Sequence, residues 1–233
     1  MGTGEQVRLN IGAGTTYIPG FVNIDISEKA DVTLDLSKDN LPFGDDSVDL
    51  IFSYHTLEHV SNYLFALSEI HRVLKHGGHL LLGLPYVTLT EYHLVNPFHL
   101  HNFSEHSFDF FDPDRLKGSA AEGNPILFKK VFHRLYYIRA FHFAPPPLRT
   151  WCRRHLFNVI RQIDYGLVAL KRVDLPIPGL GESRDQMKQE FEHCMRSRVF
   201  YEPQVLSKRD RRLRFLKQIG AWWLGYHVEM VRK

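Results

Sequence analysis

A strand-like run that ends in two glycines, within residues 7–25, constrains the fold of this chain more than any other feature. Alternating apolar residues at 7–11 lead directly into the turn Gly-Ala-Gly at 12–14. A second apolar run at 21–24 ends on a single acid, Asp25. A carboxylate at the tip of a second strand can accept two hydrogen bonds from the vicinal hydroxyls of a ribose. The pattern therefore predicts a ligand that contains a ribose.

The connection between the glycines and the second strand is short. A dinucleotide site usually has a full helix after the glycines, with the acid roughly 20 residues further on. Residues 15–20 have room for about one helical turn, include Pro19, and offer no Lys or Arg to a phosphate. This spacing favours S-adenosylmethionine over NAD, and the alternative is a glycine turn that binds nothing.

Further signals follow in the order expected of a parallel α/β sheet. Residues 31–36 and 48–53 read as strands, and apolar residues at helical spacing over 60–74 predict a helix that stops at the glycines 77–78. Residues 80–84 are nearly all apolar, which is typical of a strand buried on both faces. Ligands of such sheets bind at the carboxyl ends of the strands. The residues expected to converge there are Gly12, Asp25, Asp35 and Ser53.

Four motifs occur in order within about residues 7–105: LNIGAG, FVNID, LDLSKDNLPFGDDSVDLIFSYHTLEHV and EIHRVLKHGGHLLLGLP. Together they resemble the class I S-adenosylmethionine-dependent methyltransferases, most closely a small type-11-like branch often found in cell-surface polysaccharide pathways. The resemblance implies an α/β fold, with a Rossmann-like, open, mostly parallel seven-stranded sheet, shortened helices and a helical insertion before the last strand. It also implies S-adenosyl-L-methionine as cofactor.

The resemblance further implies roles for single residues. Gly12 and Gly14 would lie against the methionine portion of the cofactor, and Asp25 would hold the ribose hydroxyls. Asp35 would accept a hydrogen bond from the adenine amino group, beside the backbone of Leu36; the alternative is that Asp35 caps a turn.

Two more positions complete the expected cofactor site. Asn10 stands where the family often has an acid, and its side chain can hydrogen-bond the loop backbone; Ser53 would lie near the methionine end. The expected cofactor-binding residues are Asn10, Gly12, Gly14, Asp25, Ile26, Asp35, Leu36 and Ser53.

The candidate catalytic groups are two of the 14 histidines in the chain. A base is needed when the acceptor is a hydroxyl that must lose its proton, and imidazole titrates near neutral pH. His55 follows the fourth strand, and His99 matches a histidine that the family often has on the lid or acceptor wall. We expect His55 or His99 to be the base; the alternative is that these histidines cap, pack or orient.

The residues His55-Thr-Leu-Glu58-His59 also fit H-x-x-E-H, a zinc-protease pattern. The methyltransferase resemblance already accounts for Leu57-Glu58-His59. We therefore expect no metal.

Composition bears on compartment and partners. The start MGTGEQ lacks the regions of a signal peptide, no apolar run reaches about 18 residues, and the two cysteines are too few for a disulfide framework. These features predict a cytoplasmic protein.

The two halves of the chain differ in charge. Residues 1–110 hold 5 Lys/Arg and 14 Asp/Glu, whereas residues 111–233 hold 24 Lys/Arg and 12 Asp/Glu. The basic half suits either an anionic membrane, as a peripheral contact on its inner face, or a nucleic acid; it has no base-reading motif, so we expect no nucleic acid.

The second half is expected to complete the fold. Residues 125–141 read as the sixth strand and the last ten residues, LGYHVEMVRK, as an antiparallel closing strand. The expected domains are a cofactor-binding core at 1–141, a basic helical insertion or cap at 142–220 and the closing strand of the core at 221–233. The insertion could shape the acceptor pocket, lie on anionic lipid, or only cover the sheet.

The sequence thus predicts an enzyme that methylates a hydroxyl of a sugar or of a lipid-linked glycan precursor, the glycan being implied by the resemblance alone. Two alternatives stay open: a methyltransferase for a small aromatic or natural-product hydroxyl, and a non-catalytic cofactor-binding subunit that docks a partner. The acceptor is therefore a small molecule or a glycan, and the sequence does not indicate an oligomeric state.

Overall fold

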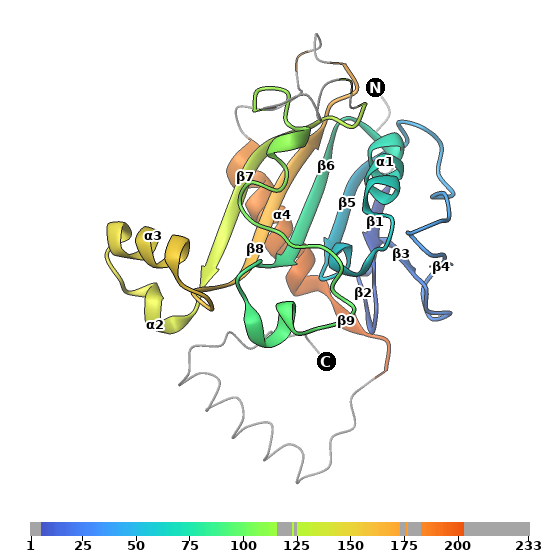
Figure 1. The fold of residues 1–233 in the computed structure, drawn as a ribbon. Coiled ribbons are helices and arrows are strands. Elements are labelled where there is room, and N and C mark those ends of the chain that lie inside the picture. The colour runs from blue at the N-terminus through green and yellow to red at the C-terminus, as the bar shows by residue number, and fades with distance from the viewer. Residues whose placement is uncertain (1–5, 116–122, 124, 173–175, 177–182, 203–233) are drawn as a thin grey trace.

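The fold is built on one twisted seven-stranded sheet, in the order β4-β3-β1-β5-β6-β8-β7 (Figure 1). The computed structural model describes residues 6–115, 123, 125–172, 176 and 183–202. The strands of the sheet are β1 (Arg8–Ile11), β3 (Val22–Asp25), β4 (Val32–Thr33), β5 (Val48–Tyr54), β6 (Leu74–Pro85), β7 (Phe128–Tyr137) and β8 (Ile160–Ala169).

Only β8 runs against the rest of this sheet. The pairs β1–β3, β3–β4, β1–β5 and β5–β6 are parallel, whereas β8 is antiparallel to both β6 and β7. This arrangement confirms the expected Rossmann-like, open, mostly parallel sheet of seven strands. The sixth strand lies where we expected it, as β7.

The reversed strand is not where the sequence placed it. We expected residues 142–220 to be a helical insertion, which is wrong for 160–169, because these residues form β8 between β6 and β7. A buried ion pair lets this polar segment enter the sheet: Asp164, fully buried on β8, is bonded by Arg134 of β7. The closing strand predicted at 221–233 lies outside the described residues.

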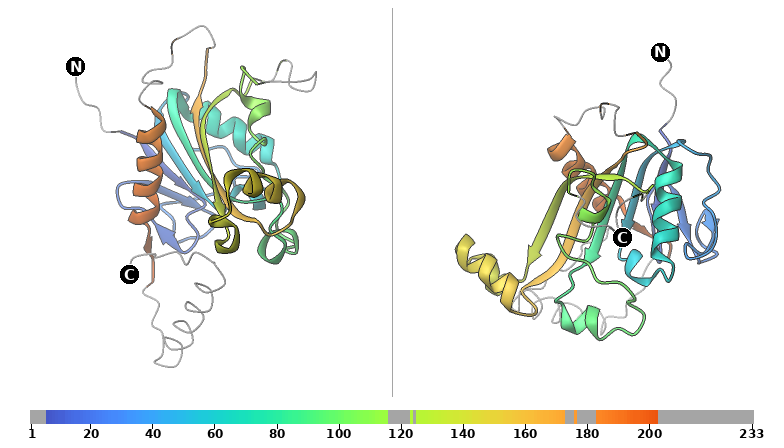
Figure 2. Two further views of the ribbon diagram at one scale, coloured as in Figure 1. Left: turned by 90° about the vertical axis from the view of Figure 1, so that its left-hand side faces the viewer. Right: turned by 45° about the horizontal axis from the view of Figure 1, so that its top comes forward.

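Helices cover the sheet on both faces (Figure 2). They are η1 (Leu57–His59), α1 (Tyr63–Val73), η2 (Thr90–Leu94), η3 (Asp109–Phe111), α2 (Arg139–His142), α3 (Pro146–His155) and α4 (Ser183–Ser197). Helix α1 packs on one face through Leu67 and Ile70, which are fully buried in the same apolar cluster as Leu9 and Ile51 of the sheet. Helix α4 lies on the opposite face.

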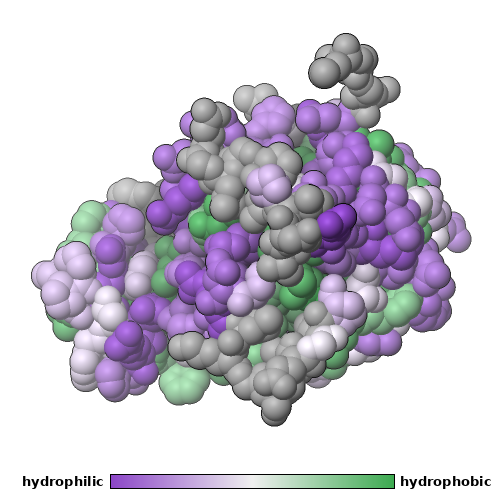
Figure 3. All heavy atoms as spheres, turned by 90° about the horizontal axis from the view of Figure 1, so that it is seen from above, coloured by the Kyte–Doolittle hydropathy of each residue, from purple (hydrophilic) through white to green (hydrophobic). Residues whose placement is uncertain are grey.

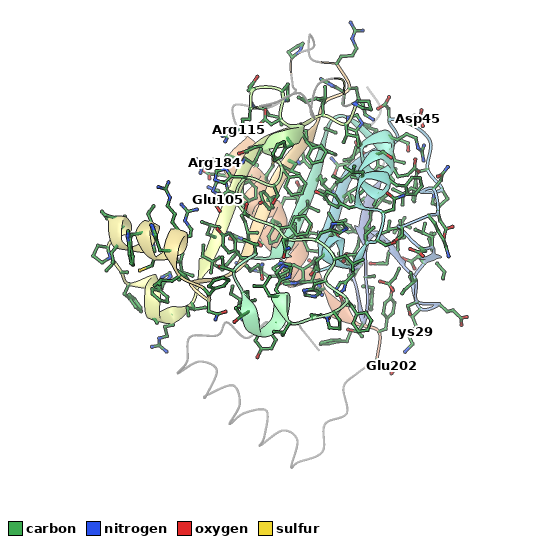
Figure 4. All side chains as sticks on the ribbon, in the orientation of Figure 1. Lys29, Asp45, Glu105, Arg115, Arg184 and Glu202 are labelled. Carbon is green, nitrogen blue, oxygen red and sulfur yellow. The ribbon has the colours of Figure 1, made fainter. Side chains whose placement is uncertain are left out.

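Helix α4 covers the face that the short β1–β3 connection leaves bare. Its buried residues Met187, Phe191 and Cys194 recur at helical spacing, and the ring of Phe191 meets Phe52 of β5 edge to face at 5.5 Å. After α4, β9 (Val199–Phe200) pairs antiparallel with β2 (Thr16–Tyr17), the only strand in the described β1–β3 connection. Lys29 and Glu202 then form an ion pair at this edge (Figure 4).

Two expected boundaries were inaccurate. Helix α1 ends at Val73, not at the glycines 77–78, and β6 begins at the next residue. Gly77, at φ +82°, instead lies within β6, beside a shift in the β5–β6 register, so it accommodates an irregular strand rather than a helix cap. The expected strand at 31–36 is only the two residues of β4.

Candidate active site

The glycine turn after β1, residues 12–14 and here named the crook, is tight and is hydrogen-bonded to the end of β3. The backbone N–H groups of Gly12 and Ala13 both donate to the carbonyl of Ile24, at 2.8 and 3.1 Å. Gly12 and Gly14 have φ of +72° and +60°, a region that side chains disfavour. The crook therefore leaves backbone exposed to a ligand at the carboxyl ends of the strands.

Asp25 is held in place at the end of β3. Its Oδ2 accepts from the Gly14 N–H at 2.8 Å and its Oδ1 from the Ser27 N–H at 3.0 Å. The next residue, Ile26, keeps 73% of its surface exposed. A fixed carboxylate beside an exposed apolar side chain suits a nucleoside, with ribose hydroxyls on the acid and a base on the apolar surface.

Asn10 is buried and points away from solvent, donating to the Oδ1 of Asn23 at 2.9 Å. Asn23 in turn accepts from the Ile18 N–H at 2.8 Å and donates to the Oδ2 of Asp31 at 2.8 Å. Asn10 thus reaches the loop backbone through Asn23, a residue that the sequence reasoning missed. A buried amide inside the apolar run FVNID was the signal that could have identified it.

Asp35 caps its own turn, as the alternative reading held. Its Oδ1 accepts from the Ser37 N–H at 2.9 Å, and the Lys38 ammonium lies 3.5 Å from its Oδ2. The Ser37 hydrogen bond, with help from Lys38, lowers the pKa of Asp35. Leu36 beside it is buried. The adenine role of both residues stays a prediction.

Ser53 is paired with Ile11 across the β1–β5 ladder, next to the crook. Its side chain is 1% exposed, and its Oγ makes no hydrogen bond to the part of the chain that the structure describes. An unsatisfied buried hydroxyl at this place fits the polar end of a ligand. Together with the crook and Asp25, it makes the site compatible with S-adenosylmethionine.

His55 and Glu58 form a dyad just beyond β5. The Nδ1 of His55 lies 3.1 Å from the Oε1 of Glu58, whose carboxylate is fully buried. His55 has φ +52°, a conformation that turns the chain sharply at the strand end. The imidazole is 38% exposed, so the dyad has one side on protein and the other on solvent.

The second candidate, His99, belongs to a different set of contacts. Its Nδ1 lies 2.7 Å from the Nδ1 of His93, and the Nε2 of His93 lies 2.8 Å from the Oδ1 of Asn102. Burial lowers the pKa of both histidines, so we expect neutral rings at neutral pH. The ring of His59 meets that of His99 at 4.5 Å. His55 and His99 are therefore linked through Glu58 and His59 rather than by direct contact.

A cavity of about 470 Å³ opens on the α4 side of the same sheet end. It is lined by Tyr54, Arg134, Tyr136, Arg161, Gln162, Phe191, Glu192, Met195 and Arg196. Tyr54 donates to Gln162 at 2.7 Å, and its ring touches that of His55 at 4.4 Å. The sequence could not indicate this cavity, because its walls come from β5, β7, β8 and α4.

The fold is an open α/β sheet, and the crook and Asp25 lie at the carboxyl ends of its strands, where sheets of this kind bind nucleosides. Residues 9–82 match the family described as "Methyltransferase domain". This match covers about a third of the chain and makes these residues similar to that family. The protein is a methyltransferase enzyme, and S-adenosyl-L-methionine is its cofactor. No curated protein matches the sequence.

Several solved structures have a similar fold at low identity. YcgJ from Bacillus subtilis is 17% identical, with 72% of this chain and 94% of that chain covered and a TM-score of 0.46. An S-adenosylmethionine-dependent methyltransferase from Mesorhizobium loti is 16% identical, with 71% and 91% covered and a TM-score of 0.44. Another from Archaeoglobus fulgidus is 13% identical, with 71% and 86% covered and a TM-score of 0.48.

Proposed function

We propose that this methyltransferase acts on a hydroxyl group of a sugar or of a lipid-linked glycan precursor. The observation that carries the hydroxyl is the His55–Glu58 dyad, which follows β5 beside the crook. A hydroxyl acceptor must lose a proton, and an imidazole oriented by a buried carboxylate is the usual base for that step. The glycan rests on the sequence resemblance and on two features of the surface described below.

Within this proposal each residue has a separate task. Gly12, Gly14, Asp25 and Ser53 would hold the cofactor, which supplies a methyl group on a positively charged sulfur. The Nδ1–H of His55 stays bonded to Glu58, so its Nε2 is free to take the proton of the acceptor hydroxyl. The buried carboxylate of Glu58 then stabilises the imidazolium that results. Of the two predicted bases, this geometry favours His55.

The cavity beside Tyr54 suits a polar acceptor. Two of its three arginines are in ion pairs, because Arg134 pairs with Asp164 and Glu192, and Arg196 pairs with Glu192. Walls that combine guanidinium, carboxylate and amide groups can donate to and accept from several hydroxyls at once. His55 does not line this cavity but lies beside the Tyr54 ring, so the hydroxyl of an acceptor bound there would have to reach past this ring to the imidazole.

The α2–α3 end of the molecule suits a membrane surface. Its exposed apolar residues, here named the α2–α3 patch, are Phe143, Leu148, Trp151, Leu156 and Phe157. Arg149 and Arg154 belong to the same helix α3, and hydrophobic and hydrophilic residues share this end of the surface, at the left of Figure 3. Apolar and cationic side chains together favour contact with anionic lipid.

This contact would be peripheral and on the inner face of a membrane, which is consistent with the cytoplasmic location expected from the sequence. Within the described residues, no helix combines the length and the apolar character needed to cross a bilayer. A peripheral position would bring the enzyme to a lipid-linked acceptor.

The test is a labelled-donor assay with purified full-length protein and three acceptor classes: free sugars, lipid-linked glycan precursors and small phenols. We expect label in a sugar or glycan fraction, in an O-methyl group stable to mild base. Label in the phenols alone would favour the small aromatic alternative. Binding of S-adenosylhomocysteine without label in any fraction would favour a docking subunit and overturn the proposal.

A further inference from the structure

Glu58, His59 and His99 bring three ligand atoms together beside the dyad. One oxygen or nitrogen from each lies within 4.8 Å of the others. They come from two segments 40 residues apart, which are clamped because the N–H groups of Leu100 and His101 both donate to the carbonyl of Glu58, at 2.7 and 3.3 Å. The cluster is therefore part of the folded framework.

The proton positions on both histidines follow from their partners. The Nδ1 of His59 lies 3.0 Å from the carbonyl oxygen of Phe98, which can only accept, so Nδ1 carries the proton and Nε2 a lone pair. The ring of His59 is exposed, which gives an ion a route from solvent. The Nε2 of His59 is therefore available as one of the three ligand atoms.

The proton position on His99 follows from the hydrogen bonds of its neighbour His93. The Asn102 Oδ1 accepts from the Nε2–H of His93, so the Nδ1 of His93 is unprotonated and must accept from the Nδ1–H of His99. The Nε2 of His99 is left with its lone pair. Partners that fix the tautomer of a histidine in this way are typical of metal ligands.

Glu58 supplies an oxygen that the fold leaves without a partner. The residue is fully buried, its Oε1 faces His55, and its Oε2 makes no hydrogen bond to any described residue. A buried carboxylate oxygen in this state is costly unless something else binds it.

We propose that Glu58, His59 and His99 form a binding site for one divalent transition-metal ion, through one oxygen and two nitrogens. Two imidazoles and a carboxylate suit Zn²⁺ or Fe²⁺, whereas Mg²⁺ and Ca²⁺ prefer oxygen ligands alone. Zn²⁺ usually takes four ligands, which leaves a position for water or an acceptor oxygen. This is a different set from the H-x-x-E-H pattern, because His55 pairs with Glu58 and the second imidazole comes from His99.

Isothermal titration of chelator-treated full-length protein with ZnCl₂ tests the site without reference to methyl transfer. We expect one equivalent of Zn²⁺ and no binding of MgCl₂. His99→Ala and Glu58→Gln should weaken Zn²⁺ binding at least about 100-fold, and His93→Ala about 10- to 100-fold as an outer partner. His142→Ala, an exposed histidine on α2, should bind like the wild type and controls for surface imidazoles.

Circular dichroism shows whether each variant is folded; if the buried Glu58 does not tolerate substitution, the exposed His59→Ala replaces it. Absence of a stoichiometric Zn²⁺ site in the wild type would overturn the proposal. So would unchanged affinity in folded His99→Ala and His59→Ala. Because the readout is binding, a wrong acceptor class would not affect it.

Discussion

The side chain of Thr56 fills the space that a Cβ atom on Gly12 would need. This contact joins the crook after β1 to the turn after β5, so the cofactor loop and the His55–Glu58 dyad share one framework. Gly12→Ala should therefore lose cofactor binding and destabilise the fold by more than the roughly 1 kcal/mol of a left-handed residue alone.

Gly14→Ala is the matched control for stability, because Gly14 has φ +60° but open space around its Cβ position. We expect denaturant unfolding to show a small loss for Gly14→Ala and a larger one for Gly12→Ala, part of which Gly12→Ala/Thr56→Gly recovers. Equal losses in the two single variants would show that the Thr56 contact does not matter.

Asp25 offers a test of the nucleoside site. Asp25→Ala removes the carboxylate that we expect to accept from two ribose hydroxyls, and should weaken the binding of S-adenosylhomocysteine by about 2–4 kcal/mol. It also frees the Gly14 N–H, so part of the loss comes from the loop. Glu28→Ala, an exposed acid in the following turn, is the control in the same calorimetric titration. Unaltered affinity in Asp25→Ala would mean that another carboxylate holds the ribose.

The base is tested by turnover at saturating cofactor. His55→Ala should lower kcat by about 10²- to 10⁴-fold, the usual contribution of a general base, while the affinity for S-adenosylhomocysteine stays at the wild-type value. His106→Ala, with a side chain that is 75% exposed and distant in sequence, should keep full turnover. If His55→Ala keeps its kcat, the acceptor does not depend on this base.

The cofactor half of the fold could be predicted because its signals are local. Alternation at 7–11, the glycines of the crook and the acid at Asp25 lie within 19 consecutive residues, so their geometry follows from the backbone alone. Strand β8 could not be predicted in the same way. Arg161 and Asp164 interrupt its apolar pattern, and a buried Asp164 is tolerable because Arg134 of β7 pairs with it and Gln162 donates to its Oδ1 at 2.6 Å.

The same limit applies to the histidines. The sequence singled out His55 and His99 as alternatives for one role, without a reason to place Glu58 between them. Their relation depends on backbone bonds from Leu100 and His101 to Glu58, a closure over about 40 residues that no local pattern encodes. Tertiary contacts therefore distinguish His55, the proposed base, from His99, the proposed ligand.

Glu69 predicts a specific acid sensitivity. Its carboxylate accepts from Arg72 at 2.8 Å and from the Leu41 N–H at 2.9 Å, and the Arg72 bonds lower its pKa below the ordinary 4.5. A lowered pKa in the folded state means stability that is present above pH 4.5 and lost as the pH falls through the folded value. Glu69→Gln should cost about 1–3 kcal/mol at pH 7, and less in acid.

Denaturant unfolding at pH 7 and near pH 3.5 measures this difference. Asp45→Asn is the control, because Asp45 pairs with the same Arg72 but is largely exposed (Figure 4), and an exposed pair contributes at most about 1 kcal/mol. A Glu69→Gln deficit that is the same at both pH values would contradict the assignment of the pKa shift.

The α2–α3 patch makes a prediction for membranes. Trp151→Ser/Phe157→Ser removes two exposed aromatic rings, and should lower binding to phosphatidylcholine–phosphatidylglycerol vesicles at least about tenfold, because ring burial and anionic attraction act together. Arg153 pairs with Glu105, so α3 should stay in place. Phe110→Ser, an exposed ring on η3 outside the patch, is the control. Equal co-sedimentation of the wild type, the double variant and Phe110→Ser with these vesicles would exclude this patch as the lipid contact. So would equal co-sedimentation of the wild type with vesicles of phosphatidylcholine alone.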